Sequence, residues 1–367
     1  MIRPAIALSA FVLCAAPAMA GEPNPPTFAE DIAPILHSQC SGCHRPDQAA
    51  PFSLLSYKDA AKKARMIRRV IDDRLMPPWP PEKACAEFVG ERHLTAAQID
   101  LIGRWVEAGA PEGDPAKTPE PPKFESGWAM GEPDLVVEMS DFFDIPASGR
   151  DIYRYFVLPL DLPEDKWVTA VDIRPSARTV VHHVLFFVDE TGEARKHEAK
   201  DGKPGFSGGR FRRTNMGGWT PGETAVPLTG GLAWPVKKGS DLVLQTHFHP
   251  SGKAEREKTT VALYFADKTP ERSMLEFQIP ALFGRFAGID IPAGEADWRL
   301  KESLTLEHDI DLMSIGGHAH QVCVSFDCKR RCPAARSNRC FRSRNGTSIG
   351  RGNTTTRNRS AFRPGPF

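Results

Sequence analysis

The sequence predicts a multidomain protein in which a small all-α domain precedes an all-β, jelly-roll-like sandwich. Its 367 residues are more than one hydrophobic core ordinarily holds. Residues 24–110 carry the start and stop signals of helices. From about Pro133, short apolar runs alternate with glycine and proline, a pattern typical of the strands of a β-sandwich. Two differently built regions are therefore expected in one chain.

The composition excludes several classes of protein. Apolar residues make up 41% and charged residues 25%, which is ordinary for a folded chain and excludes wholesale disorder. Beyond the N-terminus no apolar run approaches the roughly 18 residues of a membrane helix, so no membrane span is expected. A net charge of +1 gives no sign of a nucleic-acid partner.

Residues 1–20 predict an export signal. Arg3 is followed by the apolar run 5–16 and by Ala18-Met19-Ala20, which has the small residues of a cleavage site. We expect the mature chain to be periplasmic or secreted by a bacterium, in an oxidising compartment.

The predicted all-α domain carries two capping-box patterns. Thr27 with Glu30 forms the first, and Thr95 with Gln98 forms the second. Gly109 follows the last helical pattern and is expected to stop that helix.

Residues 111–130 predict a linker between the two regions, because their first part holds five prolines among charged residues. Segments with the texture of strands follow this linker. They are residues 134–137, 153–158, 180–188, 242–249 and 261–266.

Cys40-Ser41-Gly42-Cys43-His44 has the C-x-x-C-H arrangement of covalent c-type haem attachment. Each thiol can add to one vinyl group of the haem, and the histidine can then ligate the iron. The alternatives are a thioredoxin-like redox pair, which would need a βαβ setting, and a structural disulfide. We expect Cys40, Cys43 and His44 to hold haem c.

Met76 is expected to be the second axial ligand. It lies in a proline-rich loop that follows a helix predicted at about 56–74, and proline restricts the backbone there. Ligation by Met and His leaves no open position on the iron, which favours electron transfer over oxygen chemistry. Met66 competes for this role from the middle of the helix, and loop packing is the alternative role of Met76.

Histidines form three tight clusters in the β region. They lie at residues 182–183, 247–249 and 318–320. Residues two apart project from one face of a strand, so His318 and His320 can offer two imidazoles to one ion. Adjacent His182 and His183 project to opposite faces, so joint ligation needs a bulge or the nearer ring nitrogens; otherwise one is a ligand and the other a core residue. Imidazole-rich sites without cysteine suit copper or zinc.

The segments Val180–Leu185, Leu242–His247 and Gly317–His320 follow one another in an order that resembles the ligand segments of a known family. This family is the type II copper, ascorbate-dependent monooxygenases, which include the peptidylglycine and dopamine monooxygenases. The resemblance covers roughly residues 130–322. With its N-terminal haem motif, the chain resembles bacterial exported proteins that join a cytochrome c domain to such a copper region.

The resemblance implies two β-sandwich domains with one copper each. In the first sandwich, residues 131–268, His182, His183 and His247 would form the electron-accepting copper site.

In the second sandwich, which would start at residues 269–322, His318 and His320 would be catalytic ligands of the oxygen-binding copper. The family adds a methionine to that copper. Because no methionine follows His320 in this sequence, the resemblance implies an incomplete second sandwich.

Residues 323–367 predict an aberrant basic tail. From residue 324 onward there are 11 Lys and Arg residues and one acidic residue, whereas 36 basic and 45 acidic residues precede them. One interpretation is a basic arm that binds polyanions. The preferred hypothesis is a frameshift near residue 323, because codons read in another phase can give an aromatic, strand-like sequence.

Together these patterns predict an exported haem–copper redox protein, and most specifically a copper-dependent monooxygenase that receives electrons from its own haem. Its partners would be dioxygen, an unidentified small-molecule substrate, and a redox partner protein or small reductant. The alternatives are a non-enzymatic electron-transfer or copper-binding protein and a zinc-binding sandwich attached to cytochrome c. An incomplete second copper site would impair catalysis.

Overall fold

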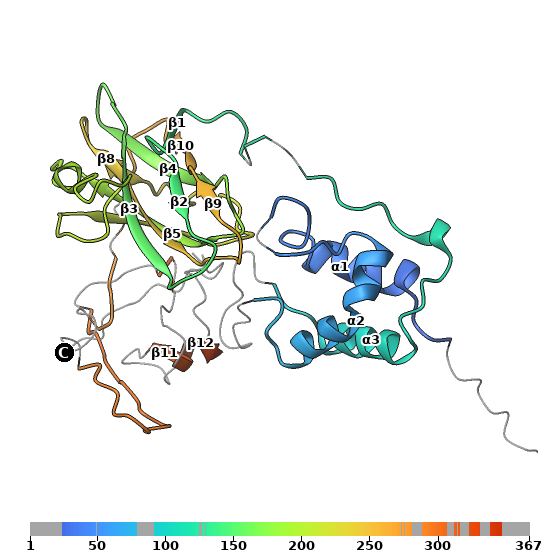
Figure 1. Ribbon diagram of the computed structural model, residues 1–367. Coiled ribbons are helices and arrows are strands. Elements are labelled where there is room, and N and C mark those ends of the chain that lie inside the picture. Colours follow the sequence, from blue (N-terminus) through green and yellow to red (C-terminus); the bar gives the residue numbers. More distant parts are fainter. Residues whose placement is uncertain are drawn as a thin grey trace, which may run out of the picture.

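The computed structural model shows three short helices followed by mainly antiparallel β-sheets (Figure 1). In Figure 1 the helices lie together to one side of the strands. The predicted order, helices first and β-structure second, is confirmed. The residues that the structure describes are 24–48, 50–78, 92–124, 127–128, 130–272, 274, 276–280, 288–306, 312–313, 315, 323–330 and 338–346.

The helical region forms because the apolar residues of each helix recur on one side and meet in a shared core. Trp105, Phe28 and Ile102 are fully buried at its centre. The helical elements are the π-helical turn η1 (Phe28–Ile32), α1 (Ala33–Gln39), α2 (Tyr57–Asp72), α3 (Ala96–Glu107) and the 3-10 turn η2 (Pro115–Lys117).

The capping box of α3 is confirmed, since the side chains and backbones of Thr95 and Gln98 bond to each other in both directions. At η1 the Thr27 hydroxyl accepts the Glu30 N–H as expected, but the Thr27 N–H donates to the carboxylate of Asp31 at 2.8 Å. Glu30 has another partner, Lys117, at 2.8 Å.

The stop signal at the end of α3 is also confirmed. Gly109 has a φ of +84°, a left-handed conformation that glycine adopts without steric cost. The N–H of Ala110 donates to the carbonyl of Trp105 at 2.9 Å, which closes the helix end in a Schellman arrangement.

The first part of the proline-rich segment is bonded to the helices. The carbonyl of Pro111 accepts the N–H of Phe28 at 2.9 Å and the indole N–H of Trp105 at 3.0 Å. The carbonyl of Glu112 accepts the N–H of Ala29 at 2.9 Å. The chain therefore leaves the helical region only after it has packed along it.

Two four-stranded antiparallel sheets make up most of the β region, and all five predicted strands lie within one residue of their predicted ends. One sheet has the order β1 (Leu135–Glu138), β10 (Thr260–Phe265), β4 (Lys166–Arg174), β7 (Trp234–Val236). The other has the order β3 (Ile152–Pro159), β8 (Asp241–Phe248), β5 (Val181–Asp189), β6 (Thr214–Trp219). The short elements β2 (Phe143–Ile145), β9 (Glu255–Glu257) and η3 (Ala194–His197) complete the region.

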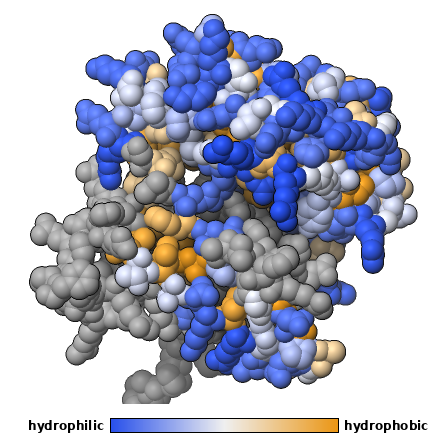
Figure 2. All heavy atoms as spheres, turned by 90° about the vertical axis from the view of Figure 1, so that its left-hand side faces the viewer, coloured by the Kyte–Doolittle hydropathy of each residue, from blue (hydrophilic) through white to orange (hydrophobic). Residues whose placement is uncertain are grey.

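The two sheets share one hydrophobic core. Val168 and Val261 from the first sheet and Phe186 and Leu244 from the second belong to the same buried cluster. Burial of such side chains stabilises each by about 1.5–3 kcal/mol. On the face shown in Figure 2, hydrophilic side chains cover most of the described surface.

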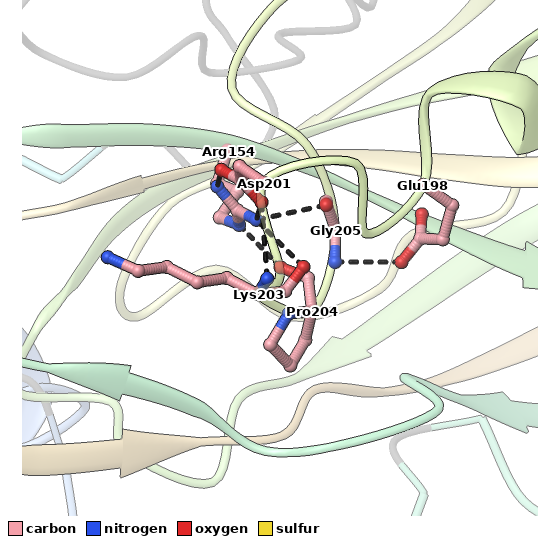
Figure 3. Close-up of polar contacts among 6 residues, drawn as sticks. All are labelled: Arg154, Glu198, Asp201, Lys203, Pro204 and Gly205. Atoms are coloured by element: carbon pink, nitrogen blue, oxygen red, sulfur yellow. Dashed lines mark hydrogen bonds and ion pairs between the residues drawn. The ribbon is translucent and has the colours of Figure 1, made fainter.

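A buried arginine on β3 holds the loop that follows η3 (Figure 3). The guanidinium of Arg154 pairs with Asp201 at 2.7 and 2.8 Å and donates to the carbonyls of Lys203, Pro204 and Gly205. The hydrogen bond from Arg154 lowers the pKa of Asp201. Glu198 binds the same loop through the N–H of Gly205 at 2.7 Å. This network holds the loop against β3.

The basic tail contributes an antiparallel pair of strands, β11 (Cys323–Arg330) and β12 (Asn338–Gly346). Within the described ranges this pair joins no other strand. None of the described helices combines the length and the apolarity that crossing a bilayer requires.

Candidate metal centre

His182, His183 and His247 converge at one end of the second sheet. His183 on β5 lies directly opposite His247 on β8 in the ladder. The register between these strands shifts between Val181 and His183, so His182 is the extra residue of a β-bulge. The bulge turns His182 toward the side of His183, although adjacent residues of a regular strand point to opposite faces. From the sequence, joint ligation by His182 and His183 was expected to need either a bulge or coordination through the nearer ring nitrogens. The structure has both, a bulge at His182 and facing Nδ1 atoms.

The three imidazoles bring their Nδ1 atoms together. The Nδ1 of His183 lies 3.2 Å from that of His182 and 3.4 Å from that of His247. Three ligand atoms, one from each histidine, lie within 4.8 Å of one another. Two nitrogens bound to one ion at about 2.0–2.1 Å in tetrahedral geometry lie about 3.3 Å apart. The two short separations therefore match those of a metal centre.

A carboxylate behind the cluster determines which nitrogen of His247 faces the centre. The Nε2 of His247 lies 2.8 Å from Asp151, so this nitrogen carries the proton and donates it. The Nδ1 is then left with its lone pair toward the other two histidines. The second oxygen of Asp151 accepts from the Nδ1 of His249 at 2.7 Å. A carboxylate that orients a ligand histidine in this way is common behind bound metals.

The electrostatics of this group follow from the same contacts. Partial burial raises the pKa of Asp151, but hydrogen bonds from His249 and His247 outweigh it and hold the pKa below its ordinary value. Burial lowers the pKa of His182, and the neighbouring His247 lowers it further. The carboxylate is thus ionised and the imidazole neutral near pH 7, which are the forms that a metal centre needs.

Tyr153 forms one wall of the cluster. It lies opposite His247 in the β3–β8 ladder, and its ring stacks on that imidazole with centroids 4.1 Å apart and planes 15° apart. His183 and His247 are buried, whereas His182 is half-buried. The centre is therefore enclosed by the sheet on one side and accessible beside His182.

The cluster could bind one metal ion, and its donors are consistent with copper. All three donors are imidazoles, which suit copper and zinc. Among the described residues this is the only group of three or more histidines, cysteines or carboxylates in such an arrangement.

The C-x-x-C-H segment begins at the end of α1. The N–H groups of Cys43 and His44 both donate to the carbonyl of Cys40, so the segment forms a tight turn. Cys40 and Cys43 are free thiols in the structure. Burial, with a contribution from Cys43, raises the pKa of Cys40 to about 12.

His44 is held by a backbone carbonyl. Its Nδ1 lies 3.2 Å from the carbonyl oxygen of Phe52, so the Nδ1 carries the proton and the Nε2 is the nitrogen with a lone pair. Its ring lies against the ring of Phe52, with centroids 4.7 Å apart. Burial lowers the pKa of His44, which keeps the imidazole neutral.

The predicted axial methionine follows α2, and the helix predicted before it is confirmed with Ser56 as its N-cap. The backbone N–H of Met76 donates to the carbonyl of Val70 at 3.1 Å, and Met76 as a whole is 40% exposed. Met66 is equally exposed on α2. The assignment of Met76 as a haem ligand stays a prediction.

The second predicted copper pair, His318 and His320, lies outside the described residues, as does the predicted export signal. Neither prediction is tested by the structure.

Sequence reasoning missed two residues of the centre, Asp151 and Tyr153. Both belong to β3 or precede it directly, and they meet His247 only through the β3–β8 register. Both strands have apolar runs in the sequence. Pairing β3 with β8 from these runs would have placed Asp151 and Tyr153 next to His247.

Neither protein-family models nor curated protein sequences match this chain.

Proposed function

We propose that this chain is an exported redox protein in which His182, His183 and His247 bind copper and exchange electrons with a c-type haem. The observation that carries the proposal is the convergence of three Nδ1 atoms, two pairs of which have the separation expected for ligands of one ion. A zinc site could use the same donors, but the haem motif in the same chain favours a redox-active ion.

The residues around Cys40 and Cys43 fit a c-type haem. The thiols are unpaired with each other, and the bond from His44 to Phe52 leaves the Nε2 of His44 to face an iron atom. A bound haem would supply one-electron chemistry, with Met76 as the proposed second axial ligand. Cys40 and Cys43 would hold the haem covalently, and the hydrogen bond from His44 to Phe52 would fix its proximal imidazole.

At the copper centre, the protein orients the ligands and keeps them deprotonated. The carboxylate of Asp151 accepts a hydrogen bond from the N–H at Nε2 of His247. The bulge at His182 brings the imidazoles of His182 and His183 to one side of the strand. Bound copper would accept and release single electrons. The half-buried side of His182 is where solvent or a small molecule reaches the centre.

The finer proposal, a copper-dependent monooxygenase, rests on the sequence resemblance. It requires a second copper on His318 and His320, together with dioxygen and a small-molecule substrate. Export to the periplasm or out of a bacterial cell is part of the same proposal. So is a redox partner protein or small reductant that supplies electrons to the haem.

Copper stoichiometry of the purified full chain tests the central part of this proposal. We expect His183→Ala to lose the copper bound at the centre, while His197→Ala keeps it. His197 is a suitable control because its imidazole bonds to the carbonyl of Arg210, outside the cluster. Equal copper content in the wild type and the His183→Ala variant would contradict the assignment. A pyridine haemochrome spectrum measures the covalent haem separately.

A further inference from the structure

The C-x-x-C-H segment touches the β region at the turn that follows β6. The Sγ of Cys43 lies 3.7 Å from the carbonyl oxygen of Pro221. These two residues are 178 positions apart in the sequence, so the contact joins the helical region to the sheet that carries the histidine cluster.

Arg92 binds both sides of this contact. Its Nη2 donates to the carbonyl of Gly222 at 2.5 Å, and its Nη1 lies 3.8 Å from the Sγ of Cys43. One guanidinium thus holds the turn against the cysteine. Hydrogen bonds from a charged donor are stronger than those from a neutral one.

Glu223 closes the turn from within. Its carboxylate accepts the N–H of Thr220 at 2.9 Å, and its backbone carbonyl accepts the indole N–H of Trp219 at 3.2 Å. Five consecutive residues, from Trp219 to Glu223, therefore form one internally bonded turn with little freedom to move away from Cys43.

Gly222 permits the close approach. Its φ is +85°, and a Cβ atom at this position would lie 2.2 Å from the Sγ of Cys43. Any side chain here would push the turn and the cysteine apart.

The other end of the turn leads directly to the histidine cluster. Trp219 is the last residue of β6 and pairs with Val184 of β5. Val184 follows His183 in the chain, and the Nδ1 of His183 lies in the histidine cluster. From Pro221 to Trp219 the path is covalent, and one ladder step then reaches the residue next to a ligand.

We propose that the Trp219–Glu223 turn is the electron path between the haem attached at Cys43 and the three-histidine centre. This inference rests on the proposed function. With both groups bound, one electron would pass from a ferrous haem to a cupric ion, and no bond or proton would be transferred. Electron tunnelling weakens steeply across gaps and less along bonds, so a path with one 3.7 Å contact and one ladder step is favourable.

The test measures electron transfer in the full chain with both haem and copper bound. Under anaerobic conditions, a short pulse of a small one-electron reductant reduces the haem, and the decay of its ferrous absorption band follows the transfer. Gly222→Ala is the main variant. Gly231→Ala is its matched control, because Gly231 also has a positive φ, +74°, but has open space around its Cβ position. Arg92→Gln loosens the turn without placing an atom against Cys43.

We expect Gly222→Ala and Arg92→Gln to slow the transfer by about tenfold or more, which corresponds to about 1.4 kcal/mol in the barrier. The haem spectrum, the haem reduction potential and the copper affinity should stay at wild-type values, and Gly231→Ala should transfer at the wild-type rate. If Gly222→Ala fails to acquire haem, the rate of Arg92→Gln decides.

Wild-type rates in the variants that carry both cofactors would overturn the path, as would equal slowing in Gly231→Ala. If the copper-loaded wild type never reoxidises its ferrous haem, the proposed function fails, and the path fails with it. If the wild type and the turn variants transfer electrons at the same rate, the proposed function stands and only the proposed electron path is wrong.

Discussion

Removal of the carboxylate at Asp151 should weaken copper binding without removing any ligand. Asp151 accepts from the Nε2 of His247 at 2.8 Å and from His249 at 2.7 Å. In Asp151→Ala the imidazole of His247 loses the acceptor that fixes its orientation and its protonated nitrogen. Loss of such an outer partner typically lowers metal affinity by about 10–100-fold, or about 1.4–2.7 kcal/mol.

The partial exposure of the Asp151 side chain determines how large a loss of copper affinity is expected. The Asp151 side chain is 35% exposed, so solvent screens part of its charge, and the loss should lie nearer tenfold than one hundredfold. Asp151→Asn keeps an oxygen that can accept from His247 but has no charge. It should therefore lose less affinity than the alanine variant.

Copper affinity can be measured by competition with a chromophoric chelator at a fixed pH. Asp144→Asn is the matched control, because Asp144 is an exposed acid paired with Arg256 rather than with a cluster histidine. If Asp151→Ala binds copper as tightly as the wild type while His183→Ala does not bind it, the assigned role of Asp151 and the Nδ1 geometry of His247 are wrong.

Two further predictions concern the stability of the fold around the centre. Burial raises the pKa of Glu223 to about 7, against the opposing hydrogen bonds from Thr220 and the charge of Arg92. The folded state therefore holds this proton more tightly than the unfolded state, and the free energy of unfolding should fall by up to about 3 kcal/mol as the pH rises from about 4.5 to about 7. Urea unfolding across this range should show a smaller fall in Glu223→Gln, and an identical pH profile in both proteins would contradict the burial of the carboxyl. Arg154→Met should lower the free energy of unfolding by about 2–4 kcal/mol, because it leaves Asp201 and three carbonyls of the loop without their donor. Hydrogen exchange should rise first in residues 198–205; unchanged exchange there would show that Arg154 does not hold the loop.

Local patterns predicted the elements well because each element depends on nearby residues. The five strands were marked by apolar runs, and α3 by the Thr95–Gln98 box and by Gly109. The acceptor for the N–H of Thr27 was predicted wrongly. Glu30 lies at the spacing of a capping box, but its carboxylate pairs with Lys117, which is 87 positions away in the sequence. Asp31 accepts the N–H of Thr27 instead.

The site was predictable in its ligands but not in its surroundings. His182, His183 and His247 were expected from their clustering, and the structure brings them together. The bulge that aligns His182 with His183 is a mismatch between two strands, so neither strand reveals it alone. The roles of Asp151 and Tyr153 depend on the β3–β8 register in the same way. The proximity of Cys43 to Pro221 depends on how the helical region meets the sheet, which no local pattern encodes.

The coordination of copper in the purified full chain tests the central claim most directly. Electron paramagnetic resonance and X-ray absorption of the protein loaded with one equivalent of cupric ion should show three imidazole nitrogens at about 2.0 Å. The nitrogen signal should disappear in His183→Ala. A copper site with sulfur ligands, or a three-imidazole spectrum that persists in His183→Ala, would contradict the assignment of His182, His183 and His247 as the copper centre.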